Sequence, residues 1–529
     1  FFRGSSETPV YLYVKNGRAE LRDASHLWGK DTVEAEEILM RESGSWARVA
    51  VIGQAGEKLS LISGISNDRG RLAARSGLGA VMGSKKLKAV VLDGRKRIPV
   101  HNRDGIKQLS RMCNRWVQFQ PPFLSGPLAA YVGTLMRILP TQMAQDGLLY
   151  KILLKKWGTG SMNQMSVEMG DAPIRNWKGS SADWGIDKSL SVNPDAIKQF
   201  EKVKYHCYSC PLGCGGICST KGKYSETHKP EYESVLALGG LCMNRDLDSL
   251  FYLNELLNRA GMDTISAGGT AAFAIECYEA GILTKEDTGG LELTWGNTPA
   301  IVSLIEKMIR REGIGDILAD GSKAAAQRIG KDADRFAMHA GGQELPMHDG
   351  RNDPGFNLHY SVEATPGRHT LGSQLYYEMF QLWKKVKGLP RAEFLYFKDR
   401  KYDADEKKAI KAAACSKFMN VVNGAGVCLF GTFLGAKRIP VFDWLNASTG
   451  WNKAPEEYME MGGHIQTLKQ GPRKTSPERG RKQGQNGGHR KDDGRLLVSI
   501  WMEPGDGQAG SGMPEEQLTG FRVRHGMTV

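Results

Sequence analysis

Three cysteines in one short run, Cys207, Cys210 and Cys214, constrain this chain more than any other feature of its sequence. Their C-x2-C-x3-C spacing allows one tight loop to present three thiolates to a single metal centre. Pro211 and Gly213 keep that loop from closing into a regular helix. The first residues of the chain do not read as a secretory signal, so this spacing is typical of metal thiolates rather than of a disulfide framework.

Spacing alone leaves three interpretations of the loop open. A cubane iron–sulfur cluster needs a fourth thiolate, which can come from far along the chain. Cys218 follows Cys214 closely enough to complete a tetrahedral zinc site instead. A C-x-x-C pair can also act as a redox dithiol. The cluster interpretation makes the protein an electron-transfer enzyme or part of one.

Length and composition exclude several classes of protein. The chain has 529 residues, enough for several domains and a large buried core. No apolar run approaches the roughly 20 residues of a membrane span. The net charge is +13, but the basic residues are spread out and form no stripe interleaved with aromatic residues, so nucleic-acid binding is not predicted. Free cysteines in apolar helical patterns (Cys113, Cys277 and Cys415) fit a reducing cytoplasm.

The pattern of apolar residues changes along the chain. Val10–Val14 and Ala19–Leu21 flank Asn16-Gly17 and predict a β-hairpin, and two further strands are expected near residues 49–53 and 89–92. From about residue 104 the pattern becomes helical. Helices are predicted over Asp246–Ala260, Pro299–Arg311 and Asp403–Val422. Residues 471–529 are rich in Gly, Gln, Arg and Lys without hydrophobic period and predict a disordered or frame-shifted tail.

A glycine-rich basic segment, Asn67–Lys86, is the second candidate site. Its glycines permit close backbone approach, and its arginines offer forked donors that suit phosphate groups. The pattern is neither a P-loop nor a dinucleotide fingerprint, and a glycine-rich turn with solvated basic residues is an equal alternative.

The order of these motifs resembles the aldehyde ferredoxin oxidoreductase family over roughly residues 1–470. The segments that carry the resemblance are Leu21–Lys30, Gly77–Lys85, the Cys207 loop, Pro230–Val235, Gly261–Ser266 and Gly424–Cys428. The resemblance implies an α+β fold, with a truncated β-rich N-terminal domain followed by two mostly helical domains and the cofactor between them. The expected domains are 1–103 (partial, pterin-cradling), 104–337 (cysteine loop and first pterin motif), 338–470 (second pterin motif and fourth cluster cysteine) and the tail 471–529.

The same resemblance implies the cofactors and the residues that hold them. Tungsten or molybdenum would be bound by two pyranopterins whose phosphates Mg²⁺ bridges, beside a [4Fe–4S] cluster. Cys207, Cys210 and Cys214 match the clustered ligands, and Cys428 matches the distant fourth, which leaves Cys218 a bystander. The positions that match pterin-binding residues are Arg71, Leu72, Arg75, Asn258, Asp263 and Asn423, where Asn258 and Asn423 replace aspartates common in the family.

Glu233 and His369 match positions that face the metal in the family and are the predicted proton-handling residues. The alternative makes Glu233 a buried structural carboxylate and His369 a satisfied loop histidine. His348 and Asp349 are further candidates for the pocket lining. Tyr252 stands where aldehyde oxidisers of the family place a glutamate, and is predicted to donate a hydrogen bond to a substrate carbonyl.

Cys242 is predicted as a thiolate ligand of the metal, which would resemble the benzoyl-CoA reductase branch of the family. The alternative for Cys242 is a buried apolar cysteine.

The resemblance therefore predicts a cytoplasmic tungstopterin enzyme that oxidises aldehydes to carboxylates with ferredoxin, or an electron-carrier subunit, as electron acceptor. A low-potential reductase of an aromatic acyl-CoA and a cluster-only electron-transfer or inactive fragment are the alternatives. Family members often form dimers, so a homodimer is compatible with the resemblance.

Overall fold

The computed structural model describes residues 3–44, 46–95, 98–120, 125–139, 146–397 and 400–474, all within one compact unit, Phe1–Asn486. Most of the predicted tail, from residue 475 onward, lies outside the described residues. Within the described ranges, no helix has both the length and the apolar character needed to cross a bilayer.

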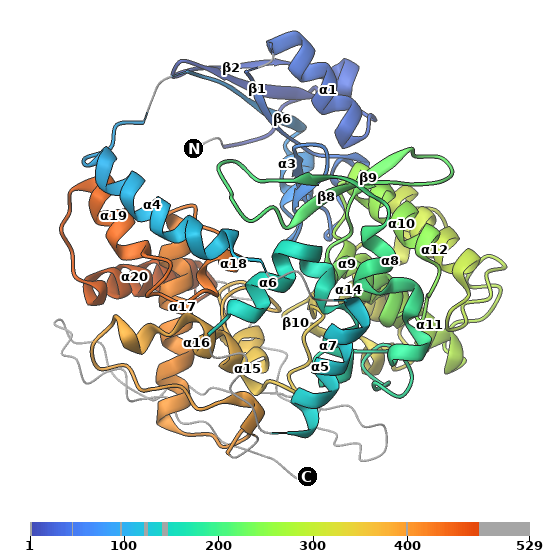
Figure 1. Ribbon diagram of the computed structural model, residues 1–529. Helices are drawn as coiled ribbons and strands as arrows, with labels where there is room; N and C mark the ends of the chain where they lie inside the picture. Colours follow the sequence, from blue (N-terminus) through green and yellow to red (C-terminus); the bar gives the residue numbers. More distant parts are fainter. Residues whose placement is uncertain are drawn as a thin grey trace, which may run out of the picture. The chain divides into compact units, whose positions relative to one another are not determined.

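A six-stranded mixed sheet forms the N-terminal part of the fold, drawn in blue in Figure 1, and its strand order is β2-β1-β6-β3-β4-β5. Only the β1–β6 pair is parallel. The elements of this part are β1 Val10–Lys15, β2 Arg18–Asp23, α1 Thr32–Ser43, β3 Arg48–Val51, α2 Gln54–Glu57, β4 Ile65–Asn67, β5 Arg71–Ala73, α3 Leu78–Ser84 and β6 Leu87–Asp93.

Local sequence explains the start of this sheet. Asn16 and Gly17 both have positive φ, as a tight two-residue hairpin turn requires, and they join β1 to β2 in the predicted antiparallel register. Asp31 caps α1 by accepting a hydrogen bond from the Glu34 backbone N–H. Alternate residues of the central strands pack against the buried face of α1 and form a separate hydrophobic core.

Helices dominate from residue 103 onward. The first group is α4 Arg103–Gln118, α5 Gly126–Ile138, α6 Leu148–Trp157, α7 Met162–Met169, α8 Pro194–Lys198, α9 Tyr232–Val235, α10 Leu247–Ala260, α11 Thr264–Glu279, α12 Thr298–Arg310, α13 Ile314–Leu318 and α14 Ser322–Ile329. The second group is α15 Pro354–Val362, α16 Gln374–Phe380, α17 Glu406–Gly424, α18 Leu429–Thr432, α19 Val441–Thr449 and α20 Pro455–Lys474. A short hairpin, β10 His339–Ala340 with β11 Gln343–Glu344, separates the two groups.

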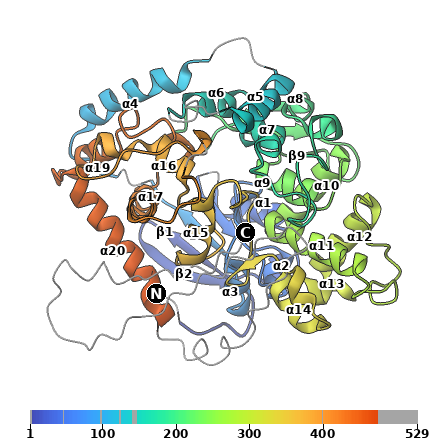
Figure 2. The ribbon, with the colours of Figure 1, turned by 90° about the horizontal axis from the view of Figure 1, so that it is seen from below.

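Each helical group has its own hydrophobic core. The first core surrounds α10, α11 and α12, and the second lies between α16, α17 and α19. In the second group α17 and α20 lie side by side (Figure 2). The division into domains at residues 103 and 337 stays a prediction.

The three predicted helices are present with small shifts at their ends. Asp246 caps α10, and Gly261, with φ of 70°, ends it as the sequence predicted. Asp405 caps α17 rather than Asp403, because the Asp405 side chain accepts a hydrogen bond from the Lys408 backbone N–H. The last helix, α20, extends to Lys474, so it passes the predicted start of the tail at residue 471.

A second sheet interrupts the helical region and was not predicted. β7 Glu201–Tyr205, β8 Gly215–Ser219 and β9 Glu226–His228 pair antiparallel in that order (Figure 1). These strands are short and rich in Lys and Gly, so they lack the apolar alternation that marks a strand in a sequence. The loop between β7 and β8 is the cysteine run, so this sheet is the support of the candidate metal site.

Candidate active site

The cysteine loop is the turn of the β7–β8 hairpin. The Cys210 backbone N–H donates to the Cys207 carbonyl at 3.0 Å, and Ser209 and Gly213 adopt positive φ. A Cβ atom at Gly213 would lie 2.3 Å from the His206 ring, so this close approach requires glycine. The hairpin thus holds the three sulfurs in one compact turn, with Cys207 exposed and Cys210 and Cys214 half-buried.

Cys428 joins this loop from far along the chain. It lies between α17 and α18 and is exposed. Partial desolvation is the largest cause that raises the pKa of Cys428. The backbone N–H groups of Phe430 and Gly431 lower that pKa, and the charges of Cys210 and Cys207 raise it further. The charge of Cys428 likewise raises the pKa of Cys214. Thiolates that repel one another in this way are stabilised by a bound cation, so the four sulfurs fit a metal cluster.

Cys218, the fourth ligand of the zinc alternative, lies apart from this group. It is fully buried on β8, and burial raises the pKa of its thiol to about 12. The charges that act on it are those of Lys229 and Glu201, not those of the other cysteines. The structure therefore groups Cys428, rather than Cys218, with the cysteine loop.

The glycine-rich basic segment lies directly against the cysteine loop. Arg71 Nη1 lies 2.8 Å from Glu231 Oε1, and the Arg71 guanidinium sits over the Tyr205 ring. Gly215 leaves room for this arginine, because a Cβ atom there would lie 2.3 Å from Arg71 Nη2. The charge of Arg71 also lowers the pKa of Cys207, although burial, the largest cause, raises it. Arg71 therefore connects the cysteine loop to the rest of the glycine-rich basic segment, which is the candidate phosphate-binding site.

Arg75 connects the same segment to both helical groups. Its Nε lies 3.5 Å from Asp263 Oδ2, and its two terminal nitrogens donate to the Gly367 and Glu344 carbonyls. Asp263 in turn caps α11. The Nε atoms of Arg71 and Arg75 are buried and find no hydrogen-bond acceptor in the described part of the chain. Buried orphan donors on two arginines fit an anionic group such as a pterin phosphate.

The other predicted pterin residues divide into two sets. Leu72 pairs with Ser66 in the sheet, and Asn258 is a near neighbour of the segment, since a Cβ atom at Gly70 would lie 3.3 Å from Asn258 Cβ. These two residues gather with Arg71, Arg75 and Asp263. Asn423 is exposed in the last turn of α17, and among the described residues no contact joins it to that set. Its predicted role stays a prediction.

Glu233 lies close to both His369 and His348, and His348 in turn contacts a further acid, Asp171. Glu233 lies on α9, which continues into a π-helical turn, Leu236–Gly240. Glu233 Oε1 lies 3.4 Å from Nε2 of both His348 and His369. The other nitrogen of His348, Nδ1, lies 2.8 Å from Asp171 Oδ2. We call these four residues, Asp171, His348, Glu233 and His369, the acid–imidazole chain.

Burial and neighbouring charges raise the pKa values of Glu233 and His348 and lower the pKa of His369. Burial raises the pKa of Glu233, although His348 opposes that rise. Burial alone would lower the pKa of His348, but the charge and hydrogen bond of Asp171 outweigh it, and the net pKa is raised. Burial lowers the pKa of His369 far below its ordinary value, and the charges of His348 and Arg75 lower it further. The chain therefore sets an imidazole of raised pKa and an imidazole of lowered pKa against the same carboxyl group, which is an arrangement suited to moving a proton.

An apolar cavity opens at this chain. His348 and Asp171 form part of its wall, together with Tyr150, Tyr232 and a cluster of methionines, Met162, Met165 and Met169. Methionine side chains adapt to ligands of different shape, so this wall suits a small apolar molecule whose polar group meets the chain. Asp349, the other predicted lining residue, is held by Arg351, whose Nη2 lies 2.6 Å from Asp349 Oδ2.

Replacing Asp171 with asparagine is expected to destabilise the protein in a pH-dependent way. The folded pKa of His348 lies above its unfolded value of about 6.5, so its contribution to stability is complete below that pH and is lost as pH rises through the folded pKa. The Asp171→Asn variant should therefore lose about 2 kcal/mol at acidic pH and less at alkaline pH. Unfolding measured across pH checks this, and an equal loss at every pH would contradict it.

Tyr252 is not part of the acid–imidazole chain. Its hydroxyl donates to Glu306 Oε1 at 2.6 Å, and its ring stacks on Tyr224. Burial and the Glu306 hydrogen bond raise its pKa. The helix that carries Tyr252 thus turns this side chain toward α12, so a role in binding the substrate carbonyl is not supported by its placement.

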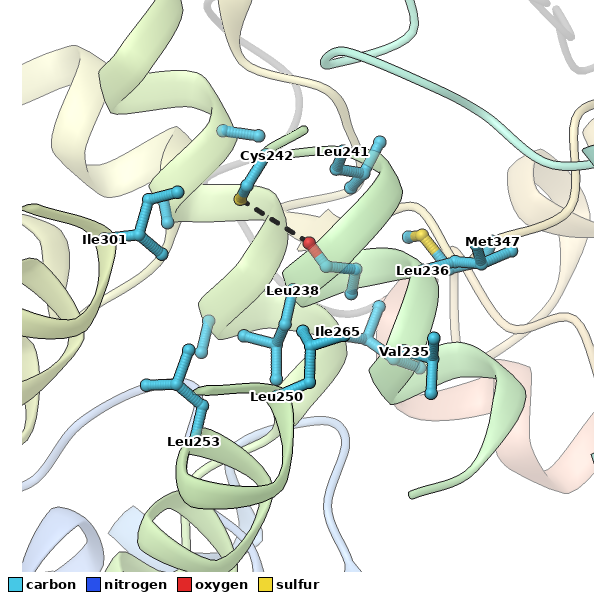
Figure 3. Packing of buried hydrophobic residues seen from close by; sticks show 14 of the residues in the cluster. Val235, Leu236, Leu238, Leu241, Cys242, Leu250, Leu253, Ile265, Ile301 and Met347 are labelled. Carbon is cyan, nitrogen blue, oxygen red and sulfur yellow. Dashed lines mark hydrogen bonds between the residues drawn. The ribbon is translucent and has the colours of Figure 1, made fainter. Parts of the chain in front are cut away.

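Cys242 lies in the hydrophobic core of the first helical group. Figure 3 shows it among aliphatic side chains that include Leu238, Leu241 and Ile301. Its sulfur lies 3.6 Å from the carbonyl oxygens of Ala237 and Gly268, and burial raises its pKa to about 12. A fully buried thiol with these neighbours supports the alternative of a buried apolar cysteine, and a role of Cys242 as a metal ligand stays a prediction.

The Cys242→Ala variant decides between these two interpretations of Cys242. We expect metal content and turnover to be unchanged, and the free energy of unfolding to fall by about 1 kcal/mol because a small buried group is lost. Elemental analysis and denaturant unfolding of both proteins give the comparison. Loss of tungsten or molybdenum from the variant would restore Cys242 as a ligand.

Comparison with known proteins agrees with this geometry. Residues 138–471 match the family model described as aldehyde ferredoxin oxidoreductase, domains 2 and 3, and residues 1–94 match the model of its N-terminal domain. The chain belongs to the aldehyde ferredoxin oxidoreductase family. It is therefore an oxidoreductase with the α+β fold that its motifs predicted.

Individual members of the aldehyde ferredoxin oxidoreductase family cover most of the chain. The tungsten-containing aldehyde ferredoxin oxidoreductases of Pyrococcus furiosus and Thermococcus kodakarensis are each 33% identical over 465 residues, which is 87% of this chain and 69% of theirs. A WOR-like subunit of an aliphatic sulfonate oxidoreductase from Pyrococcus furiosus is 30% identical over 494 residues, 88% of this chain and 68% of its own.

A solved structure also shares the fold. The active-site complex BamBC of benzoyl coenzyme A reductase, in complex with 1,5-dienoyl-CoA, superimposes with a TM-score of 0.68 at 24% identity, over 89% of this chain and 72% of that one. This likeness is one of fold.

Sequence reasoning missed Asp171 and underrated His348. Asp171 follows Gly170, which ends α7, and nothing in its local pattern distinguishes it from a surface turn residue. It becomes part of the site only because its backbone and side chain meet residues 348 and 349 from the second helical group.

Proposed function

We propose that this chain is a tungstopterin and [4Fe–4S] oxidoreductase that oxidises small apolar aldehydes to carboxylates and passes the electrons to ferredoxin. The observation that carries the proposal is the convergence of four cysteines beside Arg71, next to an acid–imidazole chain at the end of an apolar cavity. The tungsten-containing relatives support the metal, and their names support the substrate and the acceptor.

The proposed cofactor residues fit the groups they would hold. Cys207, Cys210, Cys214 and Cys428 would bind the cluster, Arg71 and Arg75 would bind pterin phosphates, and the Leu72 carbonyl would help to hold Mg²⁺. When bound, the tungstopterin supplies a centre that accepts two electrons from the substrate, and the cluster releases them one at a time.

The protein's own residues orient the aldehyde and handle protons. Oxidation of an aldehyde to a carboxylic acid takes an oxygen atom from water and releases two protons and two electrons. The methionine-rich wall excludes bulk water and holds the apolar part of the substrate. His348 and Asp171 lie at the cavity wall and pass a proton from the substrate toward Glu233. Glu233, whose pKa is raised, accepts that proton at Oε1. Neutral His369 holds Glu233 from the other side and can accept a hydrogen bond.

Anaerobic purification from cells supplied with tungstate tests the proposal. We expect iron together with tungsten or molybdenum in the protein, and reduction of benzyl viologen by apolar aldehydes such as benzaldehyde or isovaleraldehyde. Charged aldehydes such as glyoxylate should be poor substrates because most of the wall is apolar and its carboxylates, Asp171 and Asp353, repel an anion.

Two outcomes would contradict the proposal in different ways. Turnover of benzoyl-CoA without any aldehyde activity would place the chain with the aromatic acyl-CoA reductases. Iron without tungsten or molybdenum would leave a cluster-only electron-transfer protein.

A further inference from the structure

A lysine-lined hollow lies beside the cysteine loop. Lys155, Lys156, Lys198 and Lys204 line it, and its wall reaches Pro211 and Leu212 of the loop itself. Among the described residues that line it there is no aspartate or glutamate. The hollow is thus a concentrated positive charge directly next to the predicted exit for electrons.

The lysines reach this place from three different elements. Lys155 lies in the last turn of α6, Lys198 ends α8, and Lys204 lies on β7. A single helix face with solvated lysines is common, but convergence of separate elements onto one concave surface is not explained by a helix end alone. The fold therefore brings like charges together rather than spreading them.

Lys155 and Lys204 use neutral oxygens of the protein as hydrogen-bond acceptors. Lys155 donates to the amide oxygen of Gln118 at 2.9 Å, and Lys204 donates to the carbonyls of Lys155 and Gly213. In the described part of the chain, neither of these two lysines, nor Lys198, forms an ion pair with a carboxylate. Burial lowers the pKa of Lys204, and the charges of Lys229, Lys198 and Lys155 lower it further, although the charge of Glu201 opposes them.

The cysteine loop also exposes a large aromatic side chain. Tyr208, between Cys207 and Cys210, is 100% exposed. Aromatic side chains of this size are anchors at protein interfaces, where their apolar ring is covered by a partner. The fully exposed ring of Tyr208 beside exposed Cys207 suits a partner that approaches the sulfurs.

We propose that the lysine-lined hollow and Tyr208 form the docking surface for an acidic one-electron carrier protein. This inference rests on the proposed function, because the carrier is the acceptor of the electrons that aldehyde oxidation releases. Each docked carrier takes one electron from the reduced cluster, so two carriers are reduced for each aldehyde oxidised. Opposite charges on the hollow and on the carrier raise the rate at which the two proteins meet. Once the carrier has docked, the Tyr208 ring covers the path along which the electron passes from the cluster.

Steady-state kinetics of the holoenzyme with two acceptors test the docking surface. The double variant Lys155→Gln with Lys198→Gln removes two of the converging charges, and Tyr208→Ser removes the aromatic anchor. Lys407→Gln is the matched control, because Lys407 is an exposed lysine in the first turn of α17 and about 25 Å of helix separates it from the end that leads to Cys428.

We expect the KM for a purified acidic [4Fe–4S] ferredoxin to rise at least about tenfold in the double variant, with a weaker dependence on salt. Tyr208→Ser should raise the same KM without changing its salt dependence. Reduction of benzyl viologen, a small dye that needs no docking surface, should proceed at the wild-type rate in both variants and in Lys407→Gln.

The proposed docking surface would be wrong if the double variant and Lys407→Gln had the same KM for ferredoxin. It would also be wrong if the double variant lost activity equally with ferredoxin and with benzyl viologen. Calorimetric titration of ferredoxin into each protein at low salt measures docking without turnover. If wild-type enzyme reduced neither acceptor, the proposed function would fail, and the titration would still decide the docking surface by itself.

Discussion

Replacing Cys428 with alanine is expected to remove the iron–sulfur cluster from the protein. Cys428 is the single proposed ligand that comes from outside the β7–β8 hairpin, and its thiol lies within the electrostatic reach of Cys207 and Cys210. Three thiolates cannot complete the coordination of a cubane cluster, so iron content should fall to a small fraction of the wild-type value. Iron analysis and the electron paramagnetic resonance signal of the reduced protein measure the loss.

Cys218→Ala is the matched control for this experiment. Cys218 belongs to the same cysteine-rich stretch of sequence, but it is buried on β8 with its thiol protonated. We expect the control to keep its iron and its spectrum. Loss of metal from Cys218→Ala and retention in Cys428→Ala, with zinc in place of iron, would reverse the assignment.

Replacing Glu233 with glutamine is expected to lower kcat by about 10²–10⁴-fold, because a glutamine of nearly the same shape cannot accept a proton. Glu233 is the only described carboxylate that lies within 3.4 Å of both imidazoles of the acid–imidazole chain. The effect should appear in kcat for every aldehyde rather than in the KM of one. Anaerobic viologen reduction with the purified variant measures it.

Metal content and a second variant separate this effect from damage to the site. Tungsten and iron should remain at wild-type levels in Glu233→Gln. Tyr252→Phe tests the other residue that the sequence favoured, and its activity should stay within about twofold of wild type, with about 1 kcal/mol of stability lost with the Glu306 hydrogen bond. A severe loss in Tyr252→Phe and none in Glu233→Gln would exchange their roles.

The sequence determined the elements of the fold whose signals are local. The Asn16-Gly17 turn, the Asp246 cap and the Gly261 stop each depend on residues within one turn of the chain, and the structure has each of them. Motif order also sufficed to recognise the family and to propose the four cysteines. The turn, the cap and the helix stop are predicted correctly because their geometry depends on short-range sterics and hydrogen bonds.

Tertiary structure alone decided which distant residues share a site. Asp171 meets His348 across helical groups, Tyr252 turns toward α12, and Cys242 lies among leucines although its sequence context allowed a metal ligand. The lysine-lined hollow likewise exists only because α6, α8 and β7 end at one place. A helix or strand leaves open which of its faces meets the pocket, and only the packing of remote segments against it settles that choice.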